Sequence, residues 1–296
     1  MGGGVMQLTT YGSQDIYLTG NPQVTFFKVV YRRHTNFSIE SVEQHINGVD
    51  TLGSTPSNGY VTVTRNGDLL HMVYITSSTP NIEDGTAIVN DVTLEIGGQR
   101  IDKHYKEWNQ IWNELTTPVS KSLGLSCMQG GFTGLVTESN NGNGLGMVQI
   151  PLNFGFCRNP GLALPMVALQ NHEVKLKFTW GTSNSPIVTN PGCGAAAVVQ
   201  VWCDYIYLDT DERRRFAQVS HEYLIEQLQR NKLKADTKNE LHFNHPVKEL
   251  IWTSAITNAY SSANIQLNGR DRFTIQEEEY FQLKQPYEHH TSIPQT

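Results

Sequence analysis

A strand–turn–strand module that occurs twice places the strongest constraint on the fold of this 296-residue chain. Residues 92–110 read VTLEIGGQRIDKHYKEWNQ, and residues 263–282 read ANIQLNGRDRFTIQEEEYFQ. In both copies, apolar residues alternate up to a two-residue turn, which is Gly97–Gly98 in the first copy and Asn268–Gly269 in the second. Glycine and asparagine are favoured where a tight hairpin turn requires positive φ. Two unrelated hairpins would give the same pattern, so a duplication needs support from the rest of the chain.

Short apolar runs separated by turn-forming residues follow one another along the first two thirds of the chain. We expect strands at residues 24–31, 37–44, 60–64, 69–77, 89–96, 147–154, 174–180 and 198–208. Runs of this length, separated by clusters of Gly, Pro, Asn and Ser, are typical of β-sandwiches and barrels. The last run is apolar on both of its faces, which predicts a strand covered on both sides of its sheet. The sequence therefore predicts an all-β domain.

One segment interrupts this β pattern with helical spacing. An apolar stripe with spacings of three and four residues contains Ile101, Tyr105, Trp108, Trp112 and Leu115, and Thr117–Pro118 ends it. We expect these aromatic side chains to pack the helix against the core and not to form a ligand platform. A second short helix is predicted where Asp209 can act as its N-cap.

The C-terminal part of the chain contains a second series of strand candidates, which read HEYLIEQLQ, LHFNHP, LIWTSA, ANIQLNG and RFTIQ. In both series an apolar strand precedes the turn hairpin, and this shared order supports duplication. Four or five strands are too few to close a sandwich, so we expect the second domain to be incomplete. The predicted division is an N-terminal arm (1–23), a first domain (24–208), a linker helix (209–221) and the beginning of a second domain (222–296).

Charge and motif content argue against several classes of function. The net charge is −6, so the chain lacks the basic footprint of a nucleic-acid-binding surface. The motifs HExxH, GxSxG, GxxxxGK and GxGxxG do not occur, and we expect no catalytic centre, no cofactor and no metal site. No apolar stretch approaches the ~20 residues that a membrane-spanning helix requires.

Cysteine content and the single glycosylation sequon bear on the compartment. The four cysteines show no CxxC spacing, which predicts reduced thiols in cytosol-like conditions. Asn36 begins the sequon Asn36–Phe37–Ser38. It is a weak glycosylation candidate, and we expect the match to be accidental because no secretory signal is recognised at the N-terminus.

Several segments resemble the major capsid proteins of nucleocytoplasmic large DNA viruses, such as iridoviruses and phycodnaviruses. The longest are YGSQDIYLTGNPQVTFFKVVYRRHTNFSIES, LEIGGQRIDKHY, NPGLALPMVALQNHEVKLKF and DYIYLDTDERRRFAQ. The shorter blocks RNGDLL, HEYLIEQLQ, LHFNHPVKEL and IQLNGRDRF also occur in the family's order. The resemblance implies a double jelly roll, which is two tandem β-sandwiches, with the second jelly roll incomplete. The repeated hairpin would then be one element present in each jelly roll.

The resemblance also implies a function. It implies a structural protein of an icosahedral viral capsid, not an enzyme, that forms pseudo-hexagonal homotrimers tiling the outer shell. The implied partners are neighbouring capsomers, minor capsid proteins and an inner viral membrane, without direct contact with nucleic acid. The implied location is the virion, after assembly in host cytoplasm. The loops at 127–146 and 181–197 are expected to face outward and the N-terminal arm inward. Family members continue beyond QPYEHH, so the chain resembles a C-terminally truncated product or a fragment.

Two alternative functions stay open on the sequence alone. A jelly-roll carbohydrate-binding module would use exposed loops, although the loops at 127–146 and 181–197 contain no tryptophan or tyrosine. A cupin-type jelly-roll enzyme would need a constellation of histidine and glutamate on facing strands. A glycan array would test the first alternative, and a metal analysis would test the second.

Overall fold

The chain divides into two compact units, Met1–Asn36 and Phe37–Thr296. The computed structural model describes residues 5, 8–9, 12–29, 31, 33–77, 85–129, 148–181, 198–234, 236, 238–254 and 260–294. The first unit contains the short helix α2 (Ile16–Thr19). Just before this helix, the Asp15 carboxylate accepts a hydrogen bond of 2.7 Å from the Gly12 N–H, which closes a local turn.

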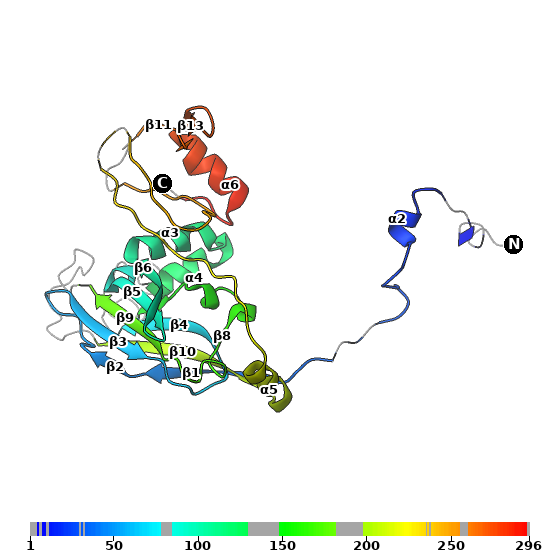
Figure 1. Cartoon of the computed structure of the whole chain (residues 1–296), viewed down its shortest axis with the longest axis horizontal. Coiled ribbons are helices and arrows are strands. Elements are labelled where there is room, and N and C mark those ends of the chain that lie inside the picture. Colours follow the sequence, from blue (N-terminus) through cyan, green and yellow to red (C-terminus); the bar gives the residue numbers. More distant parts are fainter. Residues whose placement is uncertain are drawn as a thin grey trace, which may run out of the picture. The chain divides into compact units, whose positions relative to one another are not determined.

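An antiparallel sheet, called sheet A below, forms one layer of the second unit (Figure 1). Its strand order is β1 (Phe37–Gln44), β10 (Val199–Leu208), β4 (Leu69–Ser77) and β7 (Val148–Pro151), and β8 (Leu164–Pro165) also pairs with β4. The β1–β10 register runs from Phe37 opposite Leu208 to Gln44 opposite Val201. Odd-numbered residues of β1 therefore share a face with even-numbered residues of β10.

A second antiparallel sheet, sheet B, forms the other layer. Its strand order is β2 (Ile46–Gly48), β3 (Ser57–Thr62), β9 (Val174–Trp180), β5 (Val89–Ile96) and β6 (Gln99–Tyr105). β5 and β6 form the hairpin that the sequence predicts around Gly97–Gly98.

The two sheets enclose a common hydrophobic core. β10 contributes Val201, Cys203 and Tyr205 from sheet A, and β9 contributes Phe178 and Trp180 from sheet B. The indole Nε1–H of Trp180 donates to the Val49 carbonyl at 2.8 Å, and the Tyr205 hydroxyl donates to the Thr64 carbonyl at 2.5 Å. Trp180 and Tyr205 are thus buried with their polar atoms paired, as a dense sandwich core requires.

Helices lie between and around the strands. They are η1 (Gly85–Ile88), α3 (Lys106–Thr116), α4 (Val119–Gln129), η2 (Gly155–Cys157), η3 (Pro160–Leu162) and α5 (Thr210–Gln218). Asp209 is the N-cap of α5 and accepts a hydrogen bond of 2.8 Å from the Thr210 N–H, as the sequence predicts. Arg213 of α5 forms an ion pair of 2.9 Å with the buried Asp68, which joins this helix to the end of sheet A.

The chain after α5 is more open than the sandwich. Residues 222–234 and 238–254 contain no helix or strand. The paired two-residue strands β11 (Ser262–Ala263) with β14 (Gln276–Glu277) and β12 (Gln266–Leu267) with β13 (Arg270–Asp271) follow, and then a π-helix, η4 (Tyr280–Lys284), and α6 (Gln285–His289). Among the described residues after α5, only Pro286 is buried.

The antiparallel β architecture is confirmed, but several expected strands are wrong. Residues 24–29 form no strand, and Phe26 and Phe27 are 100% and 96% exposed. The segments 221–229 and 241–246 also form no strand. The physical reason is shared: an apolar, β-prone run becomes a strand only where a neighbouring strand accepts its backbone hydrogen bonds. The C-terminal segment Gln285–His289 forms the helix α6, and His290 is its C-cap.

The strands β2 and β8 complete the sandwich beyond the expected set, and β6 is the return strand of the expected hairpin. The predicted helical stripe included Tyr105, but Tyr105 is the last residue of β6 and the helix begins at Lys106. In the part of the chain that the structure describes, no helix has both the length and the apolar character needed to cross a membrane.

Candidate functional site

The outer face of sheet A is apolar at one end of β1 and β10, where Phe37, Ile39, Ile206 and Leu208 lie, and it is more polar toward Ser41, Glu43 and Asp204. At one end of this face, Ile206 packs with Leu69 and Ala163 and is covered by Phe216 of α5. This confirms in part the prediction that β10 is covered on both sides. Next to Ile206, at the edge of the sheet, Ile39 of β1 is 54% exposed. The apolar face therefore continues into an uncovered edge.

β1 itself is an edge strand with an acidic character. Phe37 is 67% exposed, and the residues from Phe37 to Ser41 are exposed on both faces of the strand. Glu40 and Glu43 are its charged residues, and Glu43 accepts a hydrogen bond of 2.9 Å from the Gln200 amide. Exposed edge strands are the usual place where a β-protein pairs with another chain.

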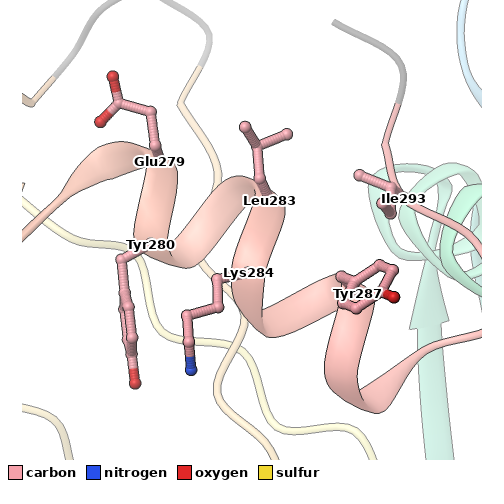
Figure 2. A pocket seen from close by; sticks show the side chains of 6 residues that line it. All are labelled: Glu279, Tyr280, Leu283, Lys284, Tyr287 and Ile293. Atoms are coloured by element: carbon pink, nitrogen blue, oxygen red, sulfur yellow. The ribbon is translucent and has the colours of Figure 1, made fainter.

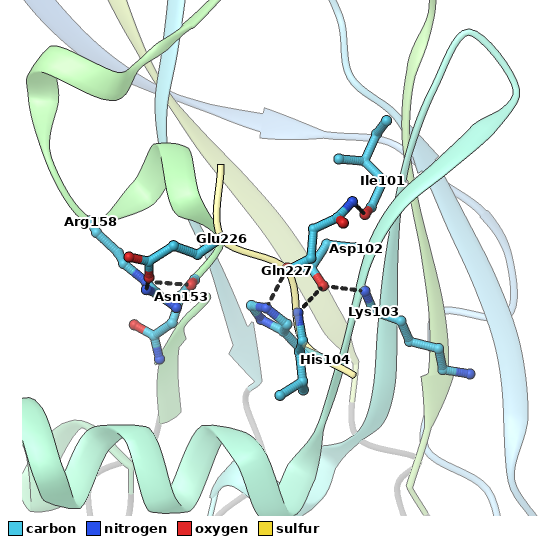
Figure 3. A network of polar contacts seen from close by, with 9 residues as sticks. Ile101, Asp102, Lys103, His104, Asn153, Arg158, Glu226 and Gln227 are labelled. Atoms are coloured by element: carbon cyan, nitrogen blue, oxygen red, sulfur yellow. Dashed lines mark hydrogen bonds and ion pairs between the residues drawn. The ribbon is translucent and has the colours of Figure 1, made fainter. Parts of the chain in front are cut away.

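At the opposite edge of the sandwich, the buried carboxylate of Asp102 binds a later segment of the chain to the edge strand β6. Asp102 of β6 accepts hydrogen bonds from the His104 Nε2–H at 2.8 Å, from the Lys103 N–H at 2.8 Å and from the Leu228 N–H at 3.0 Å (Figure 3). Asp102 and His104 are 6% and 1% exposed. The Gln227 amide donates to the Ile101 carbonyl at 2.6 Å. These bonds hold residues 226–230, called the strap below, against β6.

A second set of polar contacts with the strap is centred on Arg158 and lies beside the Asp102 network. Arg158 donates to Glu226 of the strap at 2.5 Å and to the Asn153 carbonyl at 3.1 Å (Figure 3). Its guanidinium also lies 4.0 Å from the ring centre of Trp112. A hydrogen bond from Lys248, followed by the charge of Arg158, lowers the pKa of the Glu226 carboxyl, so this side chain stays ionised against its two cations. The strap is therefore fixed by charge as well as by backbone contacts.

The predicted aromatic residues of the helical stripe lie near the strap. Trp108 and Trp112 of α3 stack with ring centres 5.3 Å apart, and both are half-buried. Tyr105 lies under the guanidinium of Arg230, 4.7 Å from its ring centre. Arg230 in turn pairs with Glu107 at 3.4 Å. The structure therefore brings Tyr105, Trp108 and Trp112 to one side of the sandwich, beside the strap.

Both predicted hairpin turns have positive φ. Gly97 and Gly98 have φ values of +60° and +81°, and Asn268 and Gly269 have values of +51° and +76°. A Cβ atom added to Gly97 would lie 2.7 Å from Nδ1 of His172, whereas one added to Gly98 would meet nothing within 4 Å. The first turn leads into the seven-residue return strand β6, while the second joins the two-residue strands β12 and β13.

The other predicted positions are exposed or lie outside the described residues. Asn36 is exposed and immediately precedes β1. Most of the predicted loops 127–146 and 181–197 lies outside the residues that the structure describes. The cysteines Cys127, Cys157 and Cys203 are free thiols.

An apolar hollow lies on the C-terminal helices. Figure 2 shows the side chains that line it, which are Glu279, Tyr280, Leu283, Lys284, Tyr287 and Ile293. Tyr287 and Leu283 are 75% and 47% exposed. No group of three or more histidine, cysteine, aspartate or glutamate side chains suited to a metal ion occurs among the described residues. An exposed apolar surface of this kind favours contact with another apolar surface.

Exposed apolar side chains also occur along the segment that follows the sandwich. Leu224 is 93% exposed, and Val247 and Leu233 are 53% and 51% exposed. Two side-chain amides bridge this segment to itself, since Gln229 donates to the Asn244 carbonyl at 2.8 Å and Asn231 to the His242 carbonyl at 3.2 Å. A surface with this many uncovered apolar groups is typical of a protein that is buried by neighbours.

Comparisons with known sequences and structures place this two-sheet fold in a family of viral capsid proteins. A family described as "Major capsid protein N-terminus" matches residues 25–209. The major capsid protein of Pyramimonas orientalis virus is 50% identical, over 100% of this chain and 78% of the relative. That of Paramecium bursaria Chlorella virus 1 (PBCV-1) is 39% identical, over 97% of this chain and 78% of the relative.

A solved structure supports the same assignment. A chain of the PBCV-1 virus capsid matches with a TM-score of 0.69 and 34% identity, and the match covers 89% of this chain and 76% of that chain. The similarity extends beyond the sandwich and includes the part of the sequence in which the described strands are short. From these matches, the chain belongs to the major capsid protein family of nucleocytoplasmic large DNA viruses.

Proposed function

We propose that this chain is a shell subunit that forms homotrimeric capsomers of pseudo-hexagonal outline, and that these capsomers tile the outer layer of an icosahedral virion. The observation that carries the proposal is the 34% identical match to a chain of the PBCV-1 virus capsid over 89% of this chain. In this role the chain carries no turnover, and its functional groups are the surfaces that neighbouring copies cover.

The surface of the molecule supports this role. The open edge at β1, the apolar hollow of the C-terminal helices and the exposed leucines after the sandwich are separate uncovered areas. A subunit within a closed shell contacts several neighbours at once, so more than one such area is expected. A monomeric soluble protein rarely exposes large contiguous apolar patches.

The proposed partners extend to minor capsid proteins and an inner viral membrane beneath the shell, and they exclude direct binding of nucleic acid. The net charge of −6 supports the last point, because a genome-wrapping surface would be basic. The free thiols of Cys127, Cys157 and Cys203 support assembly in the reducing host cytoplasm. The proposed domain division keeps a first jelly roll followed by the N-terminal part of a second one.

Native mass spectrometry tests the proposal. At concentrations of tens of micromolar, we expect a species with three times the 33.2 kDa mass of the chain. A chain that stays monomeric throughout a concentration series, while circular dichroism shows that it is folded, would refute the trimer. Negative-stain electron microscopy of the same sample should show particles with a hexagonal outline.

A further inference from the structure

The sandwich has several strand edges, and one of them is both long and open. At the other edges, β2 has three residues and β7 has four, while β6 is bonded to the strap. β1 has eight residues, and within the described part of the chain it pairs with β10 alone. An edge of this length offers a row of backbone donors and acceptors to another strand.

The first compact unit, Met1–Asn36, is called the arm from here on, and it contains a segment that suits such an edge. Residues 24–31 read VTFFKVVY, and the described apolar side chains among them are 69–100% exposed. The segment is apolar at nearly every position, so as a strand it would need cover on both faces. It is also basic, because residues 24–34 contain Lys28, Arg32 and Arg33 and no acidic residue, whereas β1 contains two glutamates and no basic residue.

From these features, we propose that residues 24–31 of one copy of this chain add as an antiparallel strand to the free edge of β1 in a second copy. The inference rests on the proposed function, because it names one of the contacts between copies. Strand addition of this kind draws its affinity from backbone hydrogen bonds and its specificity from alternate side chains.

One register uses all eight residues of both segments. It places Val24 opposite Gln44 and Tyr31 opposite Phe37. In this register Lys28 lies opposite Glu40, which forms an ion pair between the copies. The register fixes the test, because the Lys28–Glu40 pair is predicted and a Lys28–Glu43 pair is not.

The same register matches apolar side chains on both faces of β1. On the outer face, Val29 lies beside the exposed Ile39, as Tyr31 lies beside the exposed Phe37. On the inner face, Phe26 lies beside Val42, which packs against the sandwich core. Directly opposed aromatic and β-branched pairs are the contacts that stabilise antiparallel strands. The apolar end of the outer face of sheet A, around Phe37 and Ile39, is thereby extended by one strand.

The geometry of the contact is directional. The donor segment and the acceptor edge are different parts of the chain, so each copy gives its arm to one neighbour and receives an arm from another. Such a heterologous contact closes into a ring when the rotation between copies is suitable, and three copies would satisfy the proposed capsomer.

Carbodiimide cross-linking of the full chain tests the inference with native residues. Equal amounts of ¹⁴N- and ¹⁵N-labelled chain are unfolded together, refolded and treated with a zero-length carbodiimide, and the assembled fraction is isolated and digested. We expect an amide between Lys28 and Glu40 in peptides that combine a ¹⁴N half with a ¹⁵N half. The variant Glu40→Gln should abolish this cross-link, while the matched variant Glu43→Gln should retain it.

The outcomes separate this inference from the function on which it rests. An assembled fraction that yields no Lys28–Glu40 peptide, or only peptides of uniform isotope, overturns the inference and leaves the capsomer proposal standing. Uniform peptides would mean that the arm folds back on its own β1. A folded chain that forms no assembled fraction at all contradicts the capsomer proposal, and the inter-copy strand is refuted with it.

Discussion

Replacement of Asp102 by alanine removes the group that organises the closed edge of the sandwich. Its carboxylate accepts hydrogen bonds from the His104 Nε2–H and the Lys103 N–H, both at 2.8 Å, and from the Leu228 N–H at 3.0 Å. In Asp102→Ala these donors lose their acceptor, and His104, which is 1% exposed, cannot reach water. A buried donor left without a partner costs about 1–3 kcal/mol.

The magnitude follows from the surroundings of each donor. The Leu228 N–H belongs to the strap, and it can be hydrated once the strap detaches, so it adds little to the cost. His104 and Lys103 remain in β6, and together they make the expected loss about 2–4 kcal/mol of unfolding free energy. Asp102→Asn should cost about 1 kcal/mol, because its remaining oxygen can still accept the two backbone hydrogen bonds.

Urea unfolding followed by tryptophan fluorescence measures this loss, and limited proteolysis of the strap gives an independent readout. The control is Glu107→Ala, which removes the partly exposed pair with Arg230 and should cost less than about 1 kcal/mol. The reasoning is refuted if Asp102→Ala is no less stable than Glu107→Ala, or if its strap is cleaved at the wild-type rate.

Three further results are expected from the same structure. Proteases should cut within residues 222–254 earlier than they cut within the sandwich, because this segment contains no helix or strand among its described residues. Simultaneous cleavage of both parts in a gel time course would contradict this. Cys157 and Cys203 should resist alkylation until urea unfolds the chain, because burial raises the pKa of the Cys157 thiol to about 12 and also raises the pKa of Cys203. Labelling in the folded chain as fast as that of a solvent-exposed cysteine would contradict the burial of these two side chains. Gly97→Ala should lower the unfolding free energy by about 2 kcal/mol and Gly98→Ala by about 1 kcal/mol, since both positions have positive φ and only a Cβ at position 97 meets a neighbouring side chain, that of His172. Equal thermal stability of the two variants would contradict the close approach of His172 to Gly97.

The sandwich strands could be predicted because their signal is local. β4 and β9 are read correctly at 69–77 and 174–180, since their apolar runs are bounded by turn residues and neighbouring strands accept their hydrogen bonds. The Gly97–Gly98 hairpin follows from turn chemistry that two residues determine. In contrast, residues 24–31 carry the same local signal as a core strand, and only the presence of a partner edge decides whether a strand forms.

The buried network could not be predicted for a different reason. Asp102 and Leu228 are separated by 126 positions, so no local sequence pattern in either segment predicts the contact. A usable signal did exist, because Asp102 and His104 alternate on a strand opposite the buried residues Leu94 and Val92. The interpretation of residues 101–115 as one helical stripe concealed this alternation, since it assigned a period of 3.6 to residues that follow a period of 2.

Capsid assembly gives these features a common purpose. A dense sandwich supplies a rigid block, the strap holds the following segment against that block, and the edge at β1 and several apolar surfaces stay exposed in the single chain. No single side chain carries this function. It depends on which surfaces the fold leaves exposed, and such surfaces have no short sequence motif of the kind that marks a catalytic or metal-binding site.

Cryo-electron microscopy of purified virions that contain this chain tests the central claim most directly. The account predicts shell capsomers with threefold symmetry and a pseudo-hexagonal outline, in which the two sheets of residues 37–208 fit the density three times. A shell whose capsomers lack density for this sandwich, or whose symmetry does not accommodate three copies, would contradict the account.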